Sequence, residues 1–298
     1  MNANTKLIAL LGYPVVHSRS PVLFERLSGE LDLNAAYLAF DVRPNTLEKS
    51  IDGLVALGFQ GANITAPYKN SMYQMLGTKS MVATEVADAM KSVNVLYRDG
   101  DKIVGTCTDG VAFLNALRNW ADLPKMPRCA ILGNGAMAKV AMRGLWSRFA
   151  KVDLYCRDTE KASAVAKEMY VDYLGKLPGA MDGLAVSCDK PDVYPLSETK
   201  EKLRDYDLVV NATSCGLYPN VDVSPVDDDC FRPGQYVYDL IYSPEQTRLL
   251  KAASAAGCKT LNGYTMLVNQ LVENVRLWYP HETSGCSTEE LVEFCLKA

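Results

Sequence analysis

The fold class that the sequence predicts is α/β, arranged as two domains. Short apolar runs alternate with segments of helical periodicity over most of the 298 residues, a pattern typical of sheets covered by helices. Two prolines, Pro124 and Pro127, interrupt this alternation, and from residue 128 onward a regular strand–helix–strand repeat follows. The chain is long enough for two domains of ordinary size. We therefore expect one α/β domain with a mixed sheet over residues 1–110 and a second α/β domain over 111–262.

The first domain is expected to contain the mixed sheet. Apolar runs of strand length recur along it, and helical periodicity fills the intervals between the first three. The dipeptide Asp99-Gly100 is a hairpin signal, because these residues accept the backbone angles of a tight two-residue turn. The strand after this turn should therefore pair with the strand before it. The expected strands cover residues 7–11, 36–42, 61–65, 93–97 and 103–106.

The second domain is expected to follow a connecting helix. Apolar residues at five positions between 111 and 120 give that segment one buried helical face. Beyond the prolines, the spacing of strands and helices is that of βαβ units. The segment 175–197 is rich in proline, glycine and aspartate, and we expect it to be irregular. The expected elements are strands at 128–132, 152–156, 207–212 and 235–241 and helices at 136–149 and 160–169.

The C-terminal residues 263–298 are expected to pack back on the first domain. A long helix over 264–279 is apolar on one face, and Pro280 ends it because proline cannot continue a helix. A neighbouring stripe of this helix contains Gln270 and Asn274. The run Ser287-Thr-Glu-Glu290 is a capping-box signature and predicts a short final helix. The apolar face consists of Val268, Leu271, Val272, Val275 and Trp278.

Composition and charge exclude several classes of protein. A net charge of −4 provides no basic surface for nucleic acid or for a membrane. No apolar run approaches the roughly 18 residues of a membrane span, and the N-terminus has no signal-peptide pattern. Nine cysteines without a Cys-x-x-Cys motif, beside two histidines, argue against a structural metal site. We therefore expect a cytoplasmic protein with reduced thiols, a small-molecule ligand and no metal, as a monomer or a homodimer.

A glycine-rich turn opens the second domain. The motif Gly133-Asn-Gly135-Ala136-Met-Ala138 follows a strand and begins a helix, which is the context that a dinucleotide-binding fingerprint requires. Gly133 permits the tight turn, Gly135 lets the backbone approach a pyrophosphate, and Ala138 keeps helix and strand close. Amides at the start of the helix can then bind the phosphates. We predict a Rossmann-type cofactor domain; a generic strand-to-helix turn is the alternative.

The end of the following strand bears on the choice of cofactor. Arg157 and Lys161 can bind the 2′-phosphate of NADP(H), whereas Asp158 repels a phosphate and can accept from the free ribose hydroxyl of NAD(H). Two cations outnumber one anion, so we favour NADP(H) and keep NAD(H) as the other candidate. A surface ion pair between Arg157 and Asp158 is the alternative without a cofactor role.

Lys69 and Asp109 are the candidates for proton transfer in the first domain. Lys69 follows Pro67, which restrains the backbone before it to extended geometry, and Asp109 lies on a turn with Gly110. A lysine has an ordinary pKa of about 10.4, so it needs a special site to act as a base. If the two residues meet, they can bind a substrate hydroxyl and pass on its proton while hydride leaves the same carbon. The alternative is that both are solvated surface charges.

Ser18 and Ser20 are the candidates for binding a substrate carboxylate or polyol. They follow the first strand on an extended segment, where residues two apart point the same way. The structural alternative for Ser20 is the N-cap of a helix that begins at Pro21.

The motifs of this chain resemble those of the shikimate dehydrogenase family, which includes quinate/shikimate dehydrogenases. The resemblance extends from Gly12-Tyr-Pro14 to Leu277-Trp278 and leaves out only the tail after Pro280. The matching segments are 17–21, 63–69, 92–95, 107–110, 211–214, 239–244 and 263–270.

The resemblance implies a role for each matching residue. It implies that Lys69 and Asp109 are the catalytic pair and that Ser18 and Ser20 bind the substrate carboxylate. Further implied substrate contacts are Asn63, Thr65, Asn94, Tyr242 and Gln270. Further implied residues on the cofactor side are Asn211, Thr213, Ser214 and Gly263.

The activity that the resemblance implies is the reversible reduction of 3-dehydroshikimate to shikimate with NADP(H), in a cleft between the domains, on the route to chorismate and the aromatic amino acids. Departures from the family pattern keep two alternatives open. Phe24-Glu25, Cys107 and Val95 replace common polar residues and leave the fine choice of substrate open. Asp158 replaces a threonine of the cofactor clamp and favours an NAD-dependent quinate/shikimate dehydrogenase. The other alternative is a catalytically silent, cofactor-binding sensor.

Overall fold

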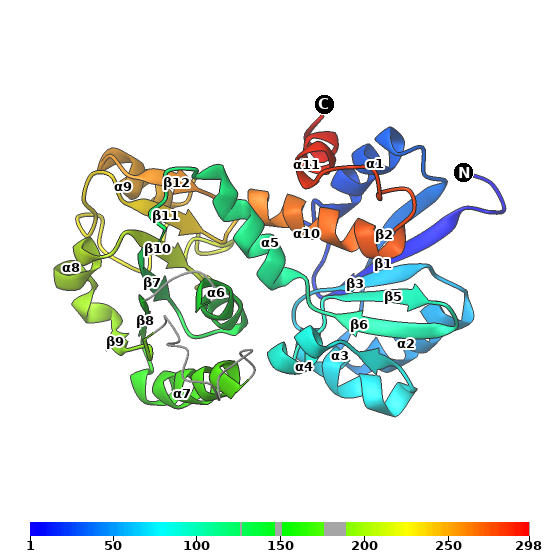
Figure 1. Ribbon diagram of the computed structural model, residues 1–298, viewed down its shortest axis with the longest axis horizontal. Helices are drawn as coiled ribbons and strands as arrows, with labels where there is room; N and C mark the ends of the chain where they lie inside the picture. Colours follow the sequence, from blue (N-terminus) through cyan, green and yellow to red (C-terminus); the bar gives the residue numbers. More distant parts are fainter. Residues whose placement is uncertain (126, 147–150, 176–188, 298) are drawn as a thin grey trace. The chain divides into compact units, whose positions relative to one another are not determined.

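The chain consists of two compact units, each built around one sheet (Figure 1). The computed structural model describes residues 1–125, 127–146, 151–175 and 189–297. Unit 1 comprises Met1–Ala112 and Leu267–Ala298, and unit 2 comprises Phe113–Met266. In the part of the chain that is described, no helix is long and apolar enough to cross a bilayer.

Unit 1 is built on a mixed sheet. Its strands are β1 (Lys6–Gly12), β2 (Ala35–Asp41), β3 (Gly61–Ile64), β4 (Val82–Ala83), β5 (Val95–Asp99) and β6 (Lys102–Thr106), in the order β2-β1-β3-β5-β6-β4. Strand β1 pairs parallel with β2 and β3, whereas β5 runs antiparallel to β3 and β6. Gly100, with a φ of 57°, forms the turn between β5 and β6, which confirms the predicted hairpin. The helices are α1 (Ser20–Glu30), α2 (Leu47–Ala56), α3 (Lys69–Leu76), α4 (Glu85–Met90), α10 (Tyr264–Trp278) and α11 (Thr288–Leu296).

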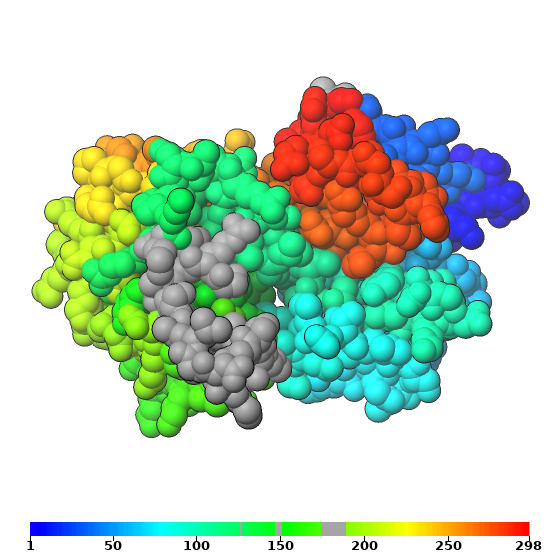
Figure 2. Space-filling view, viewed as in Figure 1, coloured from blue at the N-terminus to red at the C-terminus, as the bar shows by residue number. Residues whose placement is uncertain are grey.

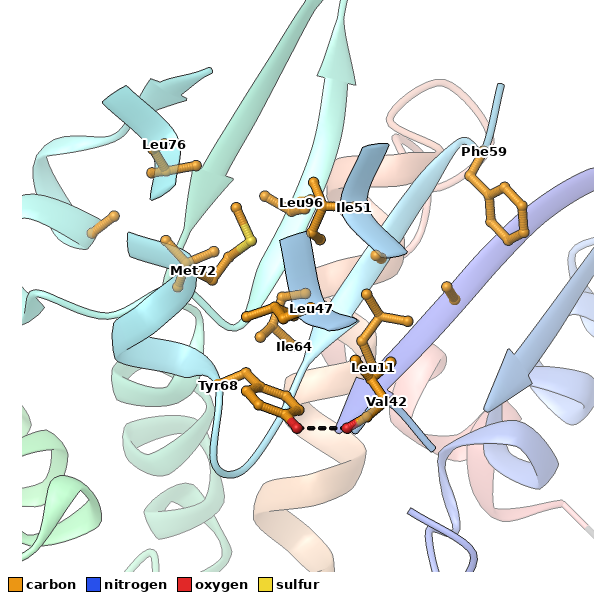
Figure 3. Packing of buried hydrophobic residues seen from close by; sticks show 14 residues of the cluster. Leu11, Val42, Leu47, Ile51, Phe59, Ile64, Tyr68, Met72, Leu76 and Leu96 are labelled. Atoms are coloured by element: carbon orange, nitrogen blue, oxygen red, sulfur yellow. Dashed lines mark hydrogen bonds between the residues drawn. The ribbon is translucent and has the colours of Figure 1, made fainter. Parts of the chain in front are cut away.

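One apolar core of unit 1 holds α2 and α3 against the sheet (Figure 3). Ile64 of β3 and Met72 of α3 are almost completely buried in it. At its edge, the Tyr68 hydroxyl donates a hydrogen bond to the Val42 carbonyl. Because Tyr68 directly precedes Lys69, this bond fixes the start of α3 and with it the position of the lysine.

Helix α10 packs on the sheet of unit 1 through Trp278, which lies against strands β3 and β5. The indole N–H of Trp278 donates to the Leu96 carbonyl at 2.9 Å. A side chain at Gly61 would meet the indole nitrogen at 2.2 Å, so glycine is required at this close approach. The predicted apolar face of the helix is confirmed, since its five residues are all buried: Val268, Leu271, Val272, Val275 and Trp278.

The last helix, α11, lies beside α1 (Figures 1 and 2). The predicted capping box is confirmed: the Ser287 hydroxyl accepts from the Glu290 amide, and the Glu290 carboxylate accepts from the Ser287 amide. Leu291 and Cys295 of α11 are buried, so the tail packs as part of unit 1.

Unit 2 is built on a parallel sheet. Its strands are β7 (Arg128–Leu132), β8 (Lys151–Cys156), β9 (Val193–Pro195), β10 (Leu208–Asn211), β11 (Tyr236–Asp239) and β12 (Lys259–Leu261). Within the described residues the order is β9-β8-β7-β10-β11-β12, with every pairing parallel. Counted from β7, this is the 3-2-1-4-5-6 order of a Rossmann sheet, which confirms the predicted fold class. Helix α5 (Asp109–Ala116) begins in unit 1 and continues into unit 2. The other helices of unit 2 are α6 (Ala136–Trp146), α7 (Thr159–Gly175), α8 (Thr199–Lys202) and α9 (Arg248–Ala255).

Several boundaries differ from the sequence-based expectation. The expectation of an irregular segment over 175–197 is wrong for β9, and its residues 176–188 lie outside the described part of the chain. Strand β9 ends in Pro195, which an edge strand tolerates because it needs no donor on its free side. Helix α7 extends to Gly175, beyond the expected end at 169, and of the expected helix 136–149 the last three residues lie outside the described part.

Candidate active site

Lys69 and Asp109 form an ion pair in unit 1. The Nζ atom of Lys69 lies 2.7 Å from Oδ2 of Asp109, although 40 residues separate them in the sequence. Lys69 follows the carboxyl end of β3, and Asp109 follows the carboxyl end of β6. Both strands run antiparallel to β5, which lies between them, so their carboxyl ends meet at one edge of the sheet. The Asp109 side chain is only 2% exposed and that of Lys69 21%, so the alternative of two solvated surface charges is excluded.

The Asp109 carboxylate accepts from four side chains. Oδ1 accepts from the Asn94 amide at 2.9 Å and from the Gln270 amide. Oδ2 accepts from Lys69 and from the Cys107 thiol, whose sulfur lies 3.7 Å away. Four donors therefore converge on one buried carboxylate and fix its orientation. The structure thus brings Asn94, Gln270 and the Lys69–Asp109 pair into one cluster.

The charge state of Lys69 follows from its surroundings. Burial by itself lowers the pKa of the ammonium, but the Asp109 carboxylate outweighs this effect, and the net pKa lies above the usual value of 10.5. Burial, and then the Asp109 carboxylate, raises the pKa of the Cys107 thiol to about 12. At neutral pH the cluster therefore holds one ammonium, one carboxylate and one neutral thiol. Such an ammonium can donate a proton to an oxygen on which negative charge develops.

A second polar group lies at the same edge of the sheet, around Ser20 and Asn63. The Tyr37 hydroxyl donates to Oδ1 of Asn63 at 2.8 Å and also hydrogen-bonds Ser20. The Asn63 amide donates to the main-chain carbonyl of Asn94 at 3.0 Å, which connects this group to the ion-pair cluster. Ser18 lies close by, since its hydroxyl accepts from the Ser20 amide at 3.3 Å. The structure therefore brings both predicted serines to the Asn63 side of the cluster.

The structural alternative for Ser20 is not found. Helix α1 begins at Ser20, and Arg19 holds the N-cap position without a side-chain cap. The side chain that accepts from the first amide of the helix is that of Ser18 and not that of Ser20. The side chain of Ser20 instead hydrogen-bonds Tyr37, a residue to which the sequence analysis assigned no role. Tyr37 lies in β2, where an aromatic residue is ordinary, so only its contacts distinguish it.

The two remaining predicted substrate residues are Thr65 and Tyr242. Thr65 is half-buried just after β3, and its amide donates to the Leu11 carbonyl at 2.9 Å. Its methyl group lies 2.3 Å from where a side chain at Gly12 would start, so Gly12 must remain a glycine there. Tyr242 belongs to unit 2 and is half-buried, and its role beside the substrate stays a prediction.

Unit 2 contains a pocket of about 710 Å³ at the carboxyl ends of its strands. Loops that follow β7, β8 and β10 line it, and β7 and β10 are the neighbours at which the strand order reverses. Ligands of open α/β sheets bind at such a switch point. The predicted cofactor residues in its lining are Gly133, Gly135, Arg157, Asp158, Lys161, Thr213 and Ser214.

The lining of this pocket is supported by one glycine, Gly133, and by a buried network of hydrogen bonds around Asn211. Gly133 has a φ of 106°, and a side chain there would meet the Thr213 methyl group at 3.1 Å. Asn211 is fully buried below the lining, where its Oδ1 accepts from the Thr213 hydroxyl at 2.7 Å and its amide donates to Asp239 at 2.9 Å. Burial raises the pKa of Asp239 to about 6, against the opposing effect of three hydrogen bonds, the first of them from Thr247. Asn211 thus supports the pocket and does not line it.

Three other predicted cofactor residues are also absent from the lining. Ala136 is exposed at the start of α6, and Ala138 is buried one turn into that helix, where a small residue suits its packing. Gly263 is buried, and a side chain there would start 2.1 Å from the Leu240 carbonyl oxygen. The structure gives Gly263 a packing reason, and its place beside a nicotinamide stays a prediction.

Among the described residues, three charged ones line the pocket: Arg157, Asp158 and Lys161. The Asp158 carboxylate accepts from the Lys161 amide at 3.0 Å and so caps the start of α7. No ion pair joins Arg157 to Asp158 in the described structure, so the alternative of a simple surface pair is not found. Both cations are exposed and line the pocket together with the aspartate.

Comparison with known proteins identifies the family. Residues 10–96 match the family model described as the shikimate dehydrogenase substrate binding domain. A shikimate dehydrogenase (NADP(+)) of Moorella thermoacetica is 35% identical over 284 residues, which cover 95% of this chain and 90% of the relative.

Solved structures agree with the match in sequence. A shikimate dehydrogenase in complex with NADP+ has a TM-score of 0.82 and 31% identity, over 99% of this chain and 96% of the other. A quinate dehydrogenase of Corynebacterium glutamicum in complex with NAD has a TM-score of 0.81 and 25% identity, over 98% and 99%. The resemblance seen in the motifs is thereby confirmed, and the chain belongs to the shikimate dehydrogenase family.

Proposed function

We propose that this protein catalyses the reversible reduction of 3-dehydroshikimate to shikimate with NADPH. The observation that carries the proposal is the buried ion pair of Lys69 and Asp109 at the sheet edge of unit 1. Membership of the shikimate dehydrogenase family and the Rossmann pocket of unit 2 support the substrate and the cofactor class.

The ion pair supplies the proton of the reaction. A nicotinamide cofactor held by the unit 2 pocket would supply hydride to the carbonyl carbon, and the carbonyl oxygen would then need one proton to become a hydroxyl. Lys69 is cationic at neutral pH because of Asp109, so it stabilises the developing oxyanion and donates that proton. Solvent restores the proton to Lys69 after the reaction. In the oxidative direction the steps run in reverse: Lys69 first gives a proton to solvent, and the resulting neutral amine accepts the hydroxyl proton as hydride leaves the carbon.

The polar group around Ser20 is proposed to hold the substrate carboxylate. The hydroxyls of Ser18 and Ser20 are the donors, and Tyr37 orients both Ser20 and Asn63. Asn63, Thr65, Asn94, Gln270 and Tyr242 are proposed contacts for the ring hydroxyls.

The three charged residues that line the unit 2 pocket are proposed to determine the choice between NADP(H) and NAD(H). Arg157 and Lys161 are free to bind a 2′-phosphate, and the relatives named as NADP-dependent support this choice. Asp158 opposes it, because a carboxylate in the same lining repels a phosphate.

The decisive experiment measures oxidation of NADPH and of NADH with 3-dehydroshikimate in parallel. We expect turnover with both, with a higher kcat/KM for NADPH. The reverse reaction is measured with shikimate and with quinate. Absence of turnover with every pair by the unaltered protein would exclude the activity and favour a cofactor-binding sensor.

A second candidate is an NAD-dependent quinate/shikimate dehydrogenase that works oxidatively. Asp158 is the observation that favours it, since its carboxylate suits a free ribose hydroxyl. A higher kcat/KM for quinate and NAD+ than for shikimate and NADP+ would establish this second candidate.

Replacement of Lys69 by alanine tests the proposed proton donor. We expect kcat to fall by at least about a thousandfold, which lies within the rate enhancement that general acid–base catalysis provides. The Kd of NADPH should change little. Lys79→Ala is the matched control, because Lys79 also pairs with a carboxylate at 2.7 Å, that of Asp52, but outside the cluster. Equal activity of Lys69→Ala and Lys79→Ala would reject the role of Lys69.

We further propose that the protein acts in the cytoplasm as a monomer or a homodimer. The eight cysteines in the described part of the chain are all free thiols, which suits a reducing compartment. Cell fractionation and light scattering of the purified protein test the two statements separately.

A further inference from the structure

The neighbourhood of Asn94 shows a hydrogen-bond chain that ends on α10. Asn94 holds Asp109 in place, so the orientation of its amide matters for the ion pair. Oδ1 of Asn94 accepts from the main-chain N–H of Thr108 at 2.8 Å. Since a main-chain N–H cannot accept and a carboxylate cannot donate, the Asn94 amide must point its NH₂ toward Asp109.

The second N–H of Asn94 points to the Thr108 hydroxyl. Its nitrogen lies 3.0 Å from Oγ1 of Thr108. Oγ1 accepts this bond only if its own hydrogen is directed elsewhere. Two acceptors are within reach, Oδ1 of Asn274 at 2.7 Å and Oδ1 of Asn94 at 3.3 Å. The shorter contact takes the hydrogen, because hydroxyl bonds are strongest near 2.7 Å.

Asn274 is therefore the end of a directed chain. The Thr108 hydroxyl donates to Asn274, the Asn94 amide donates to that hydroxyl and to Asp109, and Asp109 pairs with Lys69. Asn274 is 1% exposed and lies one turn after Gln270 on α10, on the same stripe. The helix thus contacts the carboxylate directly through one amide and indirectly through another.

We propose that Asn274 is a positioning residue for the Lys69–Asp109 pair. Without its acceptor, the Thr108 hydroxyl turns to Oδ1 of Asn94, where it competes with the Thr108 amide. Asn94 then shifts toward Thr108, and the 2.9 Å bond from Asn94 to Asp109 weakens. The ion pair keeps its charges but loses part of its fixed geometry. This inference rests on the proposed function of the pair.

The effect is measured with three variants, Asn274→Ala, Thr108→Val and the double variant. We expect kcat for 3-dehydroshikimate reduction to fall about tenfold in each single variant, the change that corresponds to one buried hydrogen bond. KM for substrate and for NADPH should change less than twofold. Because both changes break the same chain, the double variant should also lose about tenfold and not about a hundredfold.

Val275→Ala is the control for a general loosening of α10. Val275 is the next residue in the helix, is fully buried and is not a donor or an acceptor in the chain of hydrogen bonds described above. We expect it to lower the unfolding midpoint while kcat stays near that of the unaltered protein. A kcat loss of the same size in Val275→Ala and Asn274→Ala would overturn the proposal, as would full activity of Asn274→Ala or a hundredfold loss in the double variant.

A second measurement requires no turnover. The side-chain NH₂ signals of Asn94 are followed by NMR, where burial and two acceptors should protect them from exchange with solvent. We expect this protection to fall at least fivefold in Asn274→Ala and to be unchanged in Val275→Ala. If the unaltered protein shows no turnover, the proposed function fails, and unchanged protection of Asn94 in Asn274→Ala would separately overturn the positioning role.

Discussion

Lys69 experiences two opposing effects, because burial favours its neutral form and the neighbouring carboxylate favours the cation. The carboxylate prevails because it is itself buried and held by donors from three other side chains. The chemistry at position 69 therefore does not follow from the lysine side chain alone. The acidity of the lysine is a property of the cluster, and replacement of Asp109 should change it.

Asp109→Asn is expected to lower the pKa of Lys69. The asparagine keeps an acceptor for Asn94 but no longer offsets the burial of the ammonium, so the pKa of Lys69 should fall. In the proposed mechanism, reduction needs Lys69 in its protonated form. The decline of kcat/KM at alkaline pH should therefore begin at a lower pH in Asp109→Asn than in the unaltered protein. The measurement is kcat/KM for 3-dehydroshikimate as a function of pH. Asp52→Asn, which removes a carboxylate beside Lys79, is the control, and superimposable profiles for Asp109→Asn and the unaltered protein would contradict the prediction.

Asp158→Asn is expected to shift cofactor preference toward NADPH. Asparagine caps a helix as well as aspartate does, so α7 should remain intact while the charge in the pocket is lost. Removal of one charge near a phosphate corresponds to about 1 kcal/mol, or roughly fivefold in KM for NADPH. The control is Glu168→Gln, an equal charge change at an exposed position further along α7. An unchanged ratio of kcat/KM for NADPH and NADH would count against a role for Asp158.

The individual elements differ in how well the sequence predicted them. Strands with their own apolar run, such as β1 and β7, were expected within one residue of their observed ends. Strands β4 and β12 were missed because two or three residues are too few to show a period. Their strand geometry comes from pairing with β6 and β11, which no local pattern records.

The residues of the candidate site divide in the same way, into those with a local sequence motif and those that only long-range contacts identify. Lys69, Asp109 and the glycine turn at 133–135 were found because their motifs are local. Tyr37 and Asn274 were not assigned a role, because their partners lie 26 and 166 residues away in the sequence. Contacts of that separation depend on the tertiary fold, and an ordinary strand tyrosine or helix asparagine carries no local signal of them.

Helix α11 is an element whose contribution to stability can be measured directly. Leu291 is fully buried in α11, so Leu291→Ala should lower the free energy of unfolding by about 3 kcal/mol through lost burial and an internal cavity. Leu296→Ala in the same helix is the control, since that side chain is 50% exposed, and its effect should stay within about 0.5 kcal/mol. Urea unfolding followed by circular dichroism compares the two. Equal midpoints would show that α11 is not packed as described.

The free energy of unfolding is expected to depend on pH through Asp239, the last residue of β11, which Asn211 at the end of β10 contacts. Its pKa of about 6 lies above the ordinary 3.8, so the folded protein binds this proton more tightly than the unfolded chain. Stability therefore falls as pH rises from about 4 to about 6, by about 3 kcal/mol at 1.4 kcal/mol per unit. Asp239→Asn keeps an acceptor and removes the charge, so its stability relative to the unaltered protein should rise across this window. Urea midpoints at pH 4.5 and 7 give the difference, and an equal difference at both values would contradict it.

At the scale of the whole molecule, the two units hold different parts of the proposed reaction. The proposed proton donor, Lys69, and the proposed carboxylate-binding serines lie in unit 1, and the pocket proposed for the dinucleotide lies in unit 2. Hydride transfer requires both ligands to be bound to one chain at the same time. Because shikimate is proposed to bind to residues of unit 1 and NADP+ to residues of unit 2, each ligand added alone should stabilise the unit to which it binds.

Hydrogen exchange with each ligand alone tests this assignment. A ligand at 100 times its Kd stabilises the folded state by about 2.7 kcal/mol, which slows exchange in the segments that it orders by up to about a hundredfold. NADP+ should slow exchange at 133–135, 157–161 and 212–215, and shikimate should do so at 18–20, 63–69 and 107–109. Mass spectrometry of peptides resolves these segments, and segments 44–46 and 227–229, outside both sites, serve as internal controls. Protection by shikimate confined to unit 2, or by NADP+ confined to unit 1, would reverse the assignment of the ligands and remove the basis for Lys69 as the proton donor.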